Sequence, residues 1–183
     1  MKKSIINEIL QIPDKIAVTL SGQVFTIKGP KGELQKSMKR PGITFTLAEK
    51  TITITAVEPS RREKKQLYTA KAHLSNTFKG VTEGHTYKLK ICSGHFPMNA
   101  SIKNNVFEIK NFFGETVSRK ITLPSDVTVK IAAPEITVEG IDLEKTSQAA
   151  ASIEQLTRRP GYDKNRFQDG IYITEKDGQP VIN

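Results

Sequence analysis

The sequence predicts an α+β protein with two tandem duplicated domains, each an antiparallel β-sheet covered on one face by one α-helix. Three observations support this prediction: an internal repeat, segments in which apolar and polar residues alternate, and two stretches with helical periodicity. The chain has 183 residues, which is enough for two small domains. We place the first sheet-plus-helix domain at residues 1–82. The second, at residues 83–183, includes a C-terminal extension.

The internal repeat is clearest in a short motif that occurs twice. The pattern Val-Phe-x-Ile-Lys, followed by a turn and Gly-Glu, spans residues 24–33 and returns without a gap at residues 106–115. A strand signal at residues 51–55 has its counterpart at residues 135–139. Because several elements recur in one order at nearly one spacing, we interpret the chain as a tandem duplication.

Most of each copy is expected to form strands. Residues 16–21 and 87–92 alternate between apolar and polar side chains, which is typical of a sheet with one buried face. Residues 29–32 and 111–114 are predicted to be hairpin turns, because each contains a glycine that can adopt a positive φ.

Two helices are expected, one in each copy. The first begins after Pro59, where the residues from Ser60 to Glu63 form a capping box. Its apolar stripe consists of Leu67, Ala70, Leu74 and Phe78. Gly80 is the predicted end of this helix. The second helix is predicted to begin near Asp142 and to end before residues 160–161.

The charge balance indicates a polyanionic partner. Lys and Arg number 28 against 19 Asp and Glu, which gives a net charge of +9. A domain this basic attracts nucleic acid, anionic membranes or acidic proteins over a long range. The basic residues form clusters at residues 28–40 and 61–65 and in the C-terminal run at residues 157–172.

Cysteine usage and hydropathy predict a soluble cytoplasmic protein. Cys92 is the only cysteine, so no internal disulfide can form, and a reducing compartment fits this composition. The basic N-terminal segment lacks the long apolar region of a signal peptide, and no stretch approaches the length of a membrane span. We therefore expect no membrane partner.

The histidines and glycine-rich turns do not form a catalytic pattern. His73, His85 and His95 have no spacing typical of metal ligands or of a nucleophile with its base. The turn at residues 29–32 lacks the spacing of a phosphate-binding loop. The sequence therefore predicts neither an enzyme nor a metal or cofactor site.

The C-terminal run combines the side chains that bind RNA. Guanidinium groups contact phosphates in a bidentate manner, and aromatic rings stack on unpaired bases. Amide side chains add hydrogen bonds to such a surface. The residues that supply these groups are Arg158, Arg159, Tyr162, Lys164, Asn165, Arg166, Phe167 and Gln168.

Several motifs resemble one family of large-subunit ribosomal proteins, the L-six family. The duplicated halves, the turn at Gly29–Leu34 and the linker at Val81–Gly84 are similar to it. The runs His95–Met98 and Phe167–Tyr172 resemble the archaeal and eukaryotic branch of the family. The lysine- and glycine-rich C-terminal signature of the bacterial branch is absent.

The resemblance implies a structural constituent of the large ribosomal subunit that supports translation without a cofactor or catalysis. It also implies binding to large-subunit rRNA near the sarcin–ricin loop and the stalk base, beside neighbouring ribosomal proteins and translation factors. On this basis the candidate contacts extend beyond the C-terminal run. The additional residues are Ser93, Gly94, His95 and Phe96 in one loop, and Arg119 and Lys120 on the following hairpin.

Two other functions are consistent with the residues alone. A non-ribosomal RNA-binding regulator would use the same basic loop on free RNA. A protein-interaction module would instead bind acidic partners along exposed strand edges, and it would bind RNA weakly. Sedimentation with the large subunit separates both alternatives from a ribosomal protein.

Overall fold

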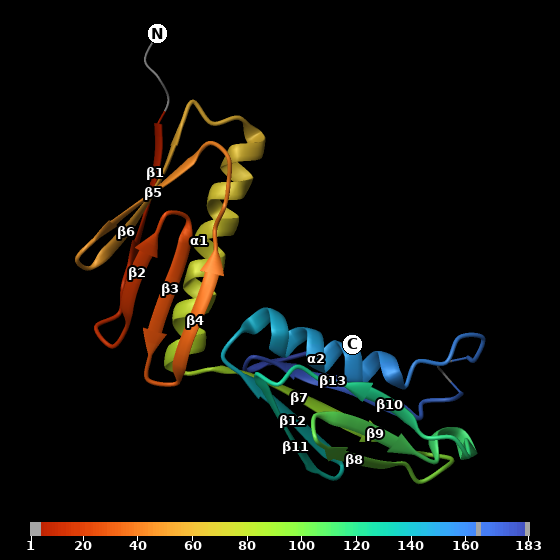
Figure 1. Ribbon diagram of the computed structural model, residues 1–183. Helices are drawn as coiled ribbons and strands as arrows, with labels where there is room; N and C mark the ends of the chain where they lie inside the picture. Colours follow the sequence, from red (N-terminus) through yellow and green to blue (C-terminus); the bar gives the residue numbers. More distant parts are fainter. Residues whose placement is uncertain (1–4, 164–165, 182–183) are drawn as a thin grey trace. The chain divides into compact units, whose positions relative to one another are not determined.

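The computed structural model describes residues 5–163 and 166–181, and it has the predicted α+β fold (Figure 1). The chain divides into two compact units, Met1–Gly84 and His85–Asn183. Each unit contains antiparallel sheets and one long α-helix. No helix within the described ranges is long and apolar enough to cross a membrane.

The first unit arranges its strands in two antiparallel sheets, with the orders β1-β6-β5 and β2-β3-β4. The strand bounds are β1 (Ile5–Gln11), β2 (Ala17–Ser21), β3 (Val24–Gly29), β4 (Gly32–Ser37), β5 (Ile43–Ala48) and β6 (Thr51–Val57). Phe25 and Ile27 of β3 and Ile52 and Ile54 of β6 are completely buried. This alternation is the expected consequence of a period of two in a sheet with one covered face.

Helix α1 (Arg61–Thr82) covers these sheets and begins as predicted. The Glu63 carboxylate accepts hydrogen bonds from the Ser60 backbone N–H, at 2.7 Å, and from the Ser60 hydroxyl. The predicted end at Gly80 is wrong, because the helix continues to Thr82. Gly80 is buried inside the last turn, whereas Gly84 adopts the left-handed conformation with φ of 79°. The backbone N–H groups of Glu83 and Gly84 both donate to the Lys79 carbonyl, which closes the helix.

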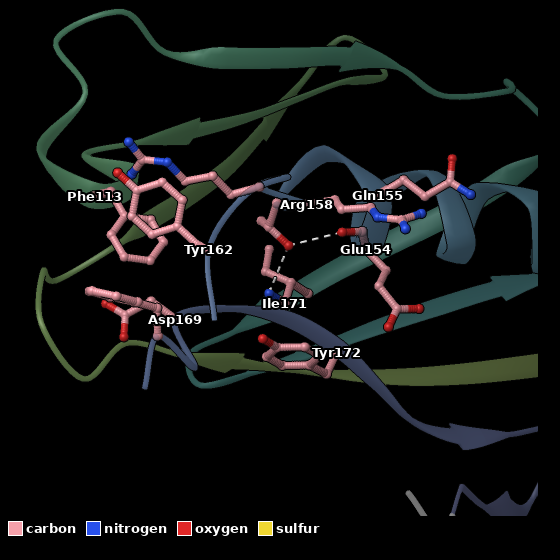
Figure 2. Close-up of a pocket in the computed structure, with 11 residues that line it drawn as sticks. Phe113, Glu154, Gln155, Arg158, Tyr162, Asp169, Ile171 and Tyr172 are labelled. Carbon is pink, nitrogen blue, oxygen red and sulfur yellow. Dashed lines mark hydrogen bonds between the residues drawn. The ribbon is translucent and has the colours of Figure 1, made fainter. Parts of the chain in front are cut away.

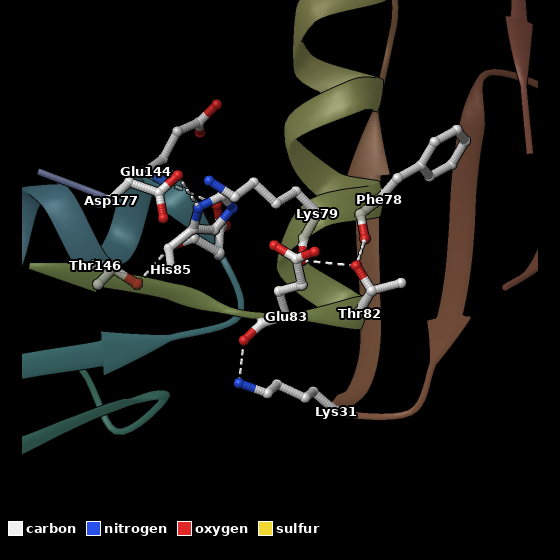
Figure 3. Close-up of polar contacts among 10 residues, drawn as sticks. Lys31, Phe78, Lys79, Thr82, Glu83, His85, Glu144, Thr146 and Asp177 are labelled. Carbon is white, nitrogen blue, oxygen red and sulfur yellow. Dashed lines mark hydrogen bonds and ion pairs between the residues drawn. The ribbon is translucent and has the colours of Figure 1, made fainter. Parts of the chain in front are cut away.

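The predicted hairpin turn between β3 and β4 contacts the C-terminus of α1. A Cβ atom at Gly29 would lie 2.7 Å from the Val81 carbonyl oxygen, so only glycine fits this approach. The Lys31 backbone N–H donates to that same oxygen at 3.0 Å. The Lys31 ammonium donates to the Glu83 carbonyl (Figure 3). The turn therefore supplies both an amide and a cation to the negative end of the helix dipole.

The second unit repeats this plan and adds strands to it. Its sheets have the orders β11-β12-β7-β13-β14 and β10-β9-β8. The strand bounds are β7 (His85–Cys92), β8 (Asn99–Lys103), β9 (Val106–Lys110), β10 (Arg119–Thr122), β11 (Val127–Ala132), β12 (Glu135–Gly140), β13 (Gly170–Lys176) and β14 (Gln179–Pro180). The order β7-β12-β11 corresponds to β1-β6-β5, and β13 pairs with the other edge of β7.

Helix α2 (Leu143–Leu156) covers the sheet of the second unit. It begins near Asp142, as predicted. Asp142 is its N-cap, and the Asp142 carboxylate accepts a hydrogen bond from the Glu144 N–H at 3.0 Å. The core between helix and sheet is apolar. It includes Leu89, Phe107, Ile109, Phe112, Ile136, Val138, Ala150, Ile153 and Ile171.

The connection between β9 and β10 is longer than the predicted turn. After β9 the chain forms a single 3₁₀ turn, η1 (Phe112–Gly114), and pairing with β9 resumes only at Arg119. Asn111 and Phe113 both have a positive φ, 60° and 49°. This local path turns the Phe112 ring into the core, where it is 1% exposed. Burial of an aromatic ring offsets the cost of the left-handed residues.

Candidate nucleic-acid interface

The chain between α2 and β13 forms the wall of a cavity of about 340 Å³ (Figure 2). The Thr157 hydroxyl accepts a hydrogen bond from the buried Ile171 N–H at 3.0 Å, which ties the start of β13 to the end of α2. The segment between these two residues therefore leaves the core and returns to it at fixed points. Among the predicted RNA-binding residues, the cavity is lined by Arg158, Arg159, Tyr162 and Phe167.

Three aromatic rings of the cavity lining contact one another, and the His95 ring contacts one of them. The centroids of the Tyr162 and Phe167 rings lie 5.2 Å apart with an interplanar angle of 76°. The Phe113 ring lies 5.9 Å from Tyr162 and 6.0 Å from Phe167, and the His95 ring lies 5.6 Å from Phe167. The contacts of Phe167 with Tyr162 and Phe113 are edge-to-face, an arrangement that stabilises aromatic pairs beyond the burial of their area. The rings thus fix one another's positions by packing, although Tyr162 remains 42% exposed to solvent.

Arg159 covers two of these rings. Its guanidinium carbon lies 4.0 Å from the Tyr162 ring centroid and 4.9 Å from that of Phe113. A cation over two aromatic faces is attracted by both ring quadrupoles. Arg158 and Arg166 are exposed, so their guanidinium groups are accessible to a phosphate.

Asp169 holds the loop at residues 93–96 against the tail. Its carboxylate accepts hydrogen bonds from the backbone N–H groups of Gly94 and His95, both at 2.9 Å, and of Phe96 at 3.2 Å. The His95 Nδ1 atom lies 3.0 Å from the same carboxylate. Burial would raise the pKa of Asp169, but the hydrogen bonds from His95, Gly94 and Phe96 outweigh it and lower the pKa to about 2.

The predicted residues of this loop are placed beside the predicted tail residues. A Cβ atom at Gly94 would lie 3.3 Å from the Asp169 carboxylate. The Phe96 ring is 42% exposed and lies 3.4 Å from the position that a Cβ atom at Gly114 would occupy. Ser93 and Gln168 are exposed. Lys164 and Asn165 lie outside the described residues, and the RNA-binding role of all these residues stays a prediction.

The two predicted residues of the following hairpin differ from each other. Arg119 donates two hydrogen bonds to Glu115, at 2.7 and 2.8 Å, and one to the Leu156 carbonyl at 2.8 Å. Its guanidinium also lies 4.4 Å from the Phe112 ring centroid. Lys120 is exposed at the surface, 3.5 Å from Glu108. Arg119 is therefore bound inside the chain, whereas Lys120 lies at the surface.

Sequence reasoning missed Phe113 and Asp169. Phe113 lies in the turn that corresponds to Gly29–Gly32 of the first copy, at the position of Lys31. This exchange of lysine for an aromatic residue is the sequence feature that could have indicated its role. Asp169 is one of two acidic residues in the basic run at residues 157–172, and at 4% exposure it is the buried one, whereas Asp163 is exposed. In the described part of the chain, no group of three His, Cys, Asp or Glu side chains could hold a metal ion.

Comparison with known proteins identifies close relatives over nearly the whole chain. The profile of the family described as "Ribosomal protein L6" matches residues 12–84 and 96–170, one stretch in each unit. The protein named "Large ribosomal subunit protein uL6" from Sulfurisphaera tokodaii is 38% identical over 178 residues, 97% of this chain and 96% of the relative. The protein of that name from Methanospirillum hungatei is 37% identical, with 95% and 99% covered. The one from Methanothrix thermoacetophila is 38% identical, with 91% and 95% covered.

Proposed function

Because the chain belongs to the ribosomal protein L6 family, we propose that it is a structural protein of the large ribosomal subunit that binds large-subunit rRNA. The family is one of structural proteins, which agrees with the prediction that this chain is not an enzyme. The observation that supports RNA binding is the set of arginine and aromatic side chains around the cavity of the second unit.

The proposed contacts divide into two chemical classes. The exposed guanidinium groups of Arg158 and Arg166 bind phosphates, since they present several N–H donors and a permanent positive charge. The Tyr162 and Phe167 rings lie against unpaired bases, which stack on aromatic faces. Arg159 contributes positive charge while its position over Tyr162 keeps that ring in place. Lys120 and Gln168, both exposed, add polar contacts. The contacts that the sequence predicts for Lys164 and Asn165 belong to residues outside the described ranges.

The loop at residues 93–96 provides a close approach to the RNA backbone. The Asp169 carboxylate takes up three of its backbone N–H groups, so the loop is fixed before RNA arrives. A fixed loop loses little conformational entropy on binding. The Arg119 guanidinium is already bound by Glu115 and by the Leu156 carbonyl. Arg119 therefore contributes to RNA binding indirectly, by positioning the end of α2 beside the surface.

We place this surface near the sarcin–ricin loop and the stalk base of the large subunit. There it faces neighbouring ribosomal proteins and translation factors, in the ribosomes of the cytoplasm. The family resemblance of the tail motif at residues 167–172 supports this location. Footprinting of the reconstituted complex on large-subunit rRNA tests it, because protection confined to another rRNA domain contradicts the location.

RNA affinity measured across a range of salt concentrations tests the binding surface. Replacing Arg158 and Arg166 with alanine removes two phosphate contacts, which lowers the salt slope by roughly two and the affinity about tenfold or more. A matched control removes two charges from Lys103 and Lys130. Lys103 lies at the opposite end of the β8–β9 hairpin from Phe113, and Lys130 pairs with Glu139. Equal losses in both double variants would refute the assignment.

Sedimentation of cell extracts tests the ribosomal role itself. The chain is expected to stay with large subunits when the particles are washed with increasing salt. Recovery at the top of the gradient would favour a free RNA-binding regulator or a protein-interaction module.

A further inference from the structure

The cavity has a polar end that lies away from the Phe113 and Tyr162 rings. In Figure 2 the Phe113 and Tyr162 rings lie at one end of the cavity, while Glu154 and Gln155 lie at the other. Ile171, which is 1% exposed, and Tyr172 lie between the two ends. Its volume of about 340 Å³ falls within the range of roughly 300–1,000 Å³ of sites that bury a small organic group.

Glu154 is placed where it does not help the helix that carries it. It lies in the last turn of α2, where the helix dipole is negative and a carboxylate is unfavourable. In the described part of the chain, no salt bridge involves the Glu154 carboxylate. An acidic side chain that neither stabilises its helix nor pairs with a cation, in so basic a region, indicates a binding role.

Tyr172 provides a second polar group, between the two ends of the cavity. A Cβ atom at Gly170 would lie 3.2 Å from the Tyr172 hydroxyl, so the glycine lets the ring lie back along β13. Burial raises the pKa of Tyr172, and the negative charges of Cys92, Asp169 and Glu154 raise it further. The hydroxyl therefore remains a hydrogen-bond donor in the cavity, and in Figure 2 it points away from Glu154.

We infer that this cavity holds one unpaired guanine base of the bound RNA, with the Glu154 carboxylate reading the base edge that carries N1–H and N2–H₂. The inference rests on the proposed function and names the part of the RNA that enters the site. A carboxylate accepts two parallel hydrogen bonds from that edge of guanine. Adenine presents an acceptor at N1, which a carboxylate repels, and cytosine offers a single amino donor.

The rest of the lining argues against a cationic side chain as the occupant. Aromatic rings and a carboxylate also suit lysine or arginine, but Arg158 and Arg159 line the same cavity. Their charges repel a cation and attract the phosphate attached to a base. The charge of the lining therefore favours a nucleotide.

Chemical probing of guanines in the complex tests the inference. The full-length protein is bound to large-subunit rRNA, and the RNA is treated with a glyoxal reagent that modifies N1 and N2 of accessible guanines. We expect the wild-type chain to protect an unpaired guanine, and Glu154→Gln to restore its reactivity. Affinity for the rRNA is expected to fall about fivefold to a hundredfold, the effect of one lost bidentate base contact. Glu144→Gln, at the other end of α2, is the matched control and should leave protection intact.

The outcomes separate this inference from the proposed function. If the wild-type chain binds the rRNA but the same guanines are protected with Glu154→Gln, the guanine site is wrong and RNA binding stands. If the wild-type chain does not bind the rRNA, the proposed function itself fails. Denaturant unfolding of Glu154→Gln checks for a structural role, because loss of a carboxylate at the negative end of a helix is expected to leave stability equal or higher.

Discussion

The corresponding turns of the two units have different chemistry. After β3, the turn presents Lys31 to the C-terminus of α1 and lies so close to Val81 that only glycine fits at residue 29. After β9, the turn buries Phe112 and directs Phe113 to the cavity, where it contacts Tyr162 and Phe167. One position of the repeat thus completes a helix in the first unit and contributes to the aromatic lining of a cavity in the second.

The helix end still receives a cation in the second unit, but from another residue. Arg119 donates to the Leu156 carbonyl at the end of α2, as Lys31 donates to the Glu83 carbonyl at the end of α1. A cation at this end of a helix is favourable in both cases. The duplicated fold therefore keeps its helix-end cation while the turn itself changes. This comparison explains why Arg119, although basic and close to the cavity, has its donors inside the chain.

The largest effect is expected for Asp169→Asn, because within the described ranges a buried carboxylate fixes a loop in the second unit alone. In the wild type, both carboxylate oxygens of Asp169 accept hydrogen bonds from backbone N–H groups. Asparagine replaces one of these oxygens with an NH₂ group, which cannot accept them. The free energy of unfolding should fall by about 2 to 3 kcal/mol at neutral pH. Denaturant unfolding measures this loss, and an unchanged midpoint would contradict the role of Asp169.

The same carboxylate predicts how stability depends on pH. The pKa of Asp169 in the folded chain is about 2, below its ordinary value of 3.8. Its contribution is therefore fully present above pH 3.8 and is lost as the pH falls through about 2. The stability difference between wild type and Asp169→Asn should shrink over this interval. A difference that stays constant down to pH 2 would mean that the charge contributes nothing.

Arg119→Ala comes next and tests whether the helix-end cation matters. The substitution removes the hydrogen bond to the Leu156 carbonyl and leaves Glu115, which is two-thirds buried, without its partner. We expect a loss of about 1 to 2 kcal/mol in the free energy of unfolding, since both groups are partly exposed. Lys120→Ala, at the adjacent surface residue, should cost less than about 0.5 kcal/mol. Equal costs would mean that Arg119 is no more structural than its neighbour.

The sequence predicted the repeated architecture because the repeat, the alternation and the capping box are local patterns. It also indicated the tail residues that surround the cavity, since arginine and aromatic side chains alternate along one segment. The sequence could not predict the structural role of Arg119, because the fold alone brings its partners Leu156 and Glu115 together. The role of Asp169 was hidden for the same reason, as its amide donors are more than 70 residues away.

A smaller effect on stability and RNA affinity is expected for Phe113→Leu. The substitution removes an aromatic ring that the second turn has and the first turn lacks. Leucine keeps apolar volume but loses the ring contacts with Tyr162 and Phe167 and the face beneath Arg159. We expect about 1 kcal/mol less stability and roughly a fivefold weaker affinity for large-subunit rRNA. Filter binding measures the affinity, and wild-type affinity would show that the aromatic cluster does not organise the RNA surface.

The smallest effect is expected for Lys31→Ala in the first turn. The ammonium is solvent-accessible, so its interaction with the negative end of α1 is worth only about 0.5 kcal/mol. The backbone N–H of residue 31 still donates to the Val81 carbonyl after the substitution, so the turn keeps its path. RNA affinity should change no more than for any other single lysine of the first unit, such as Lys36→Ala. If Lys31→Ala instead weakened RNA binding as strongly as Arg158→Ala, the two turns would share a function, and the contrast between a structural turn and a binding turn would be wrong.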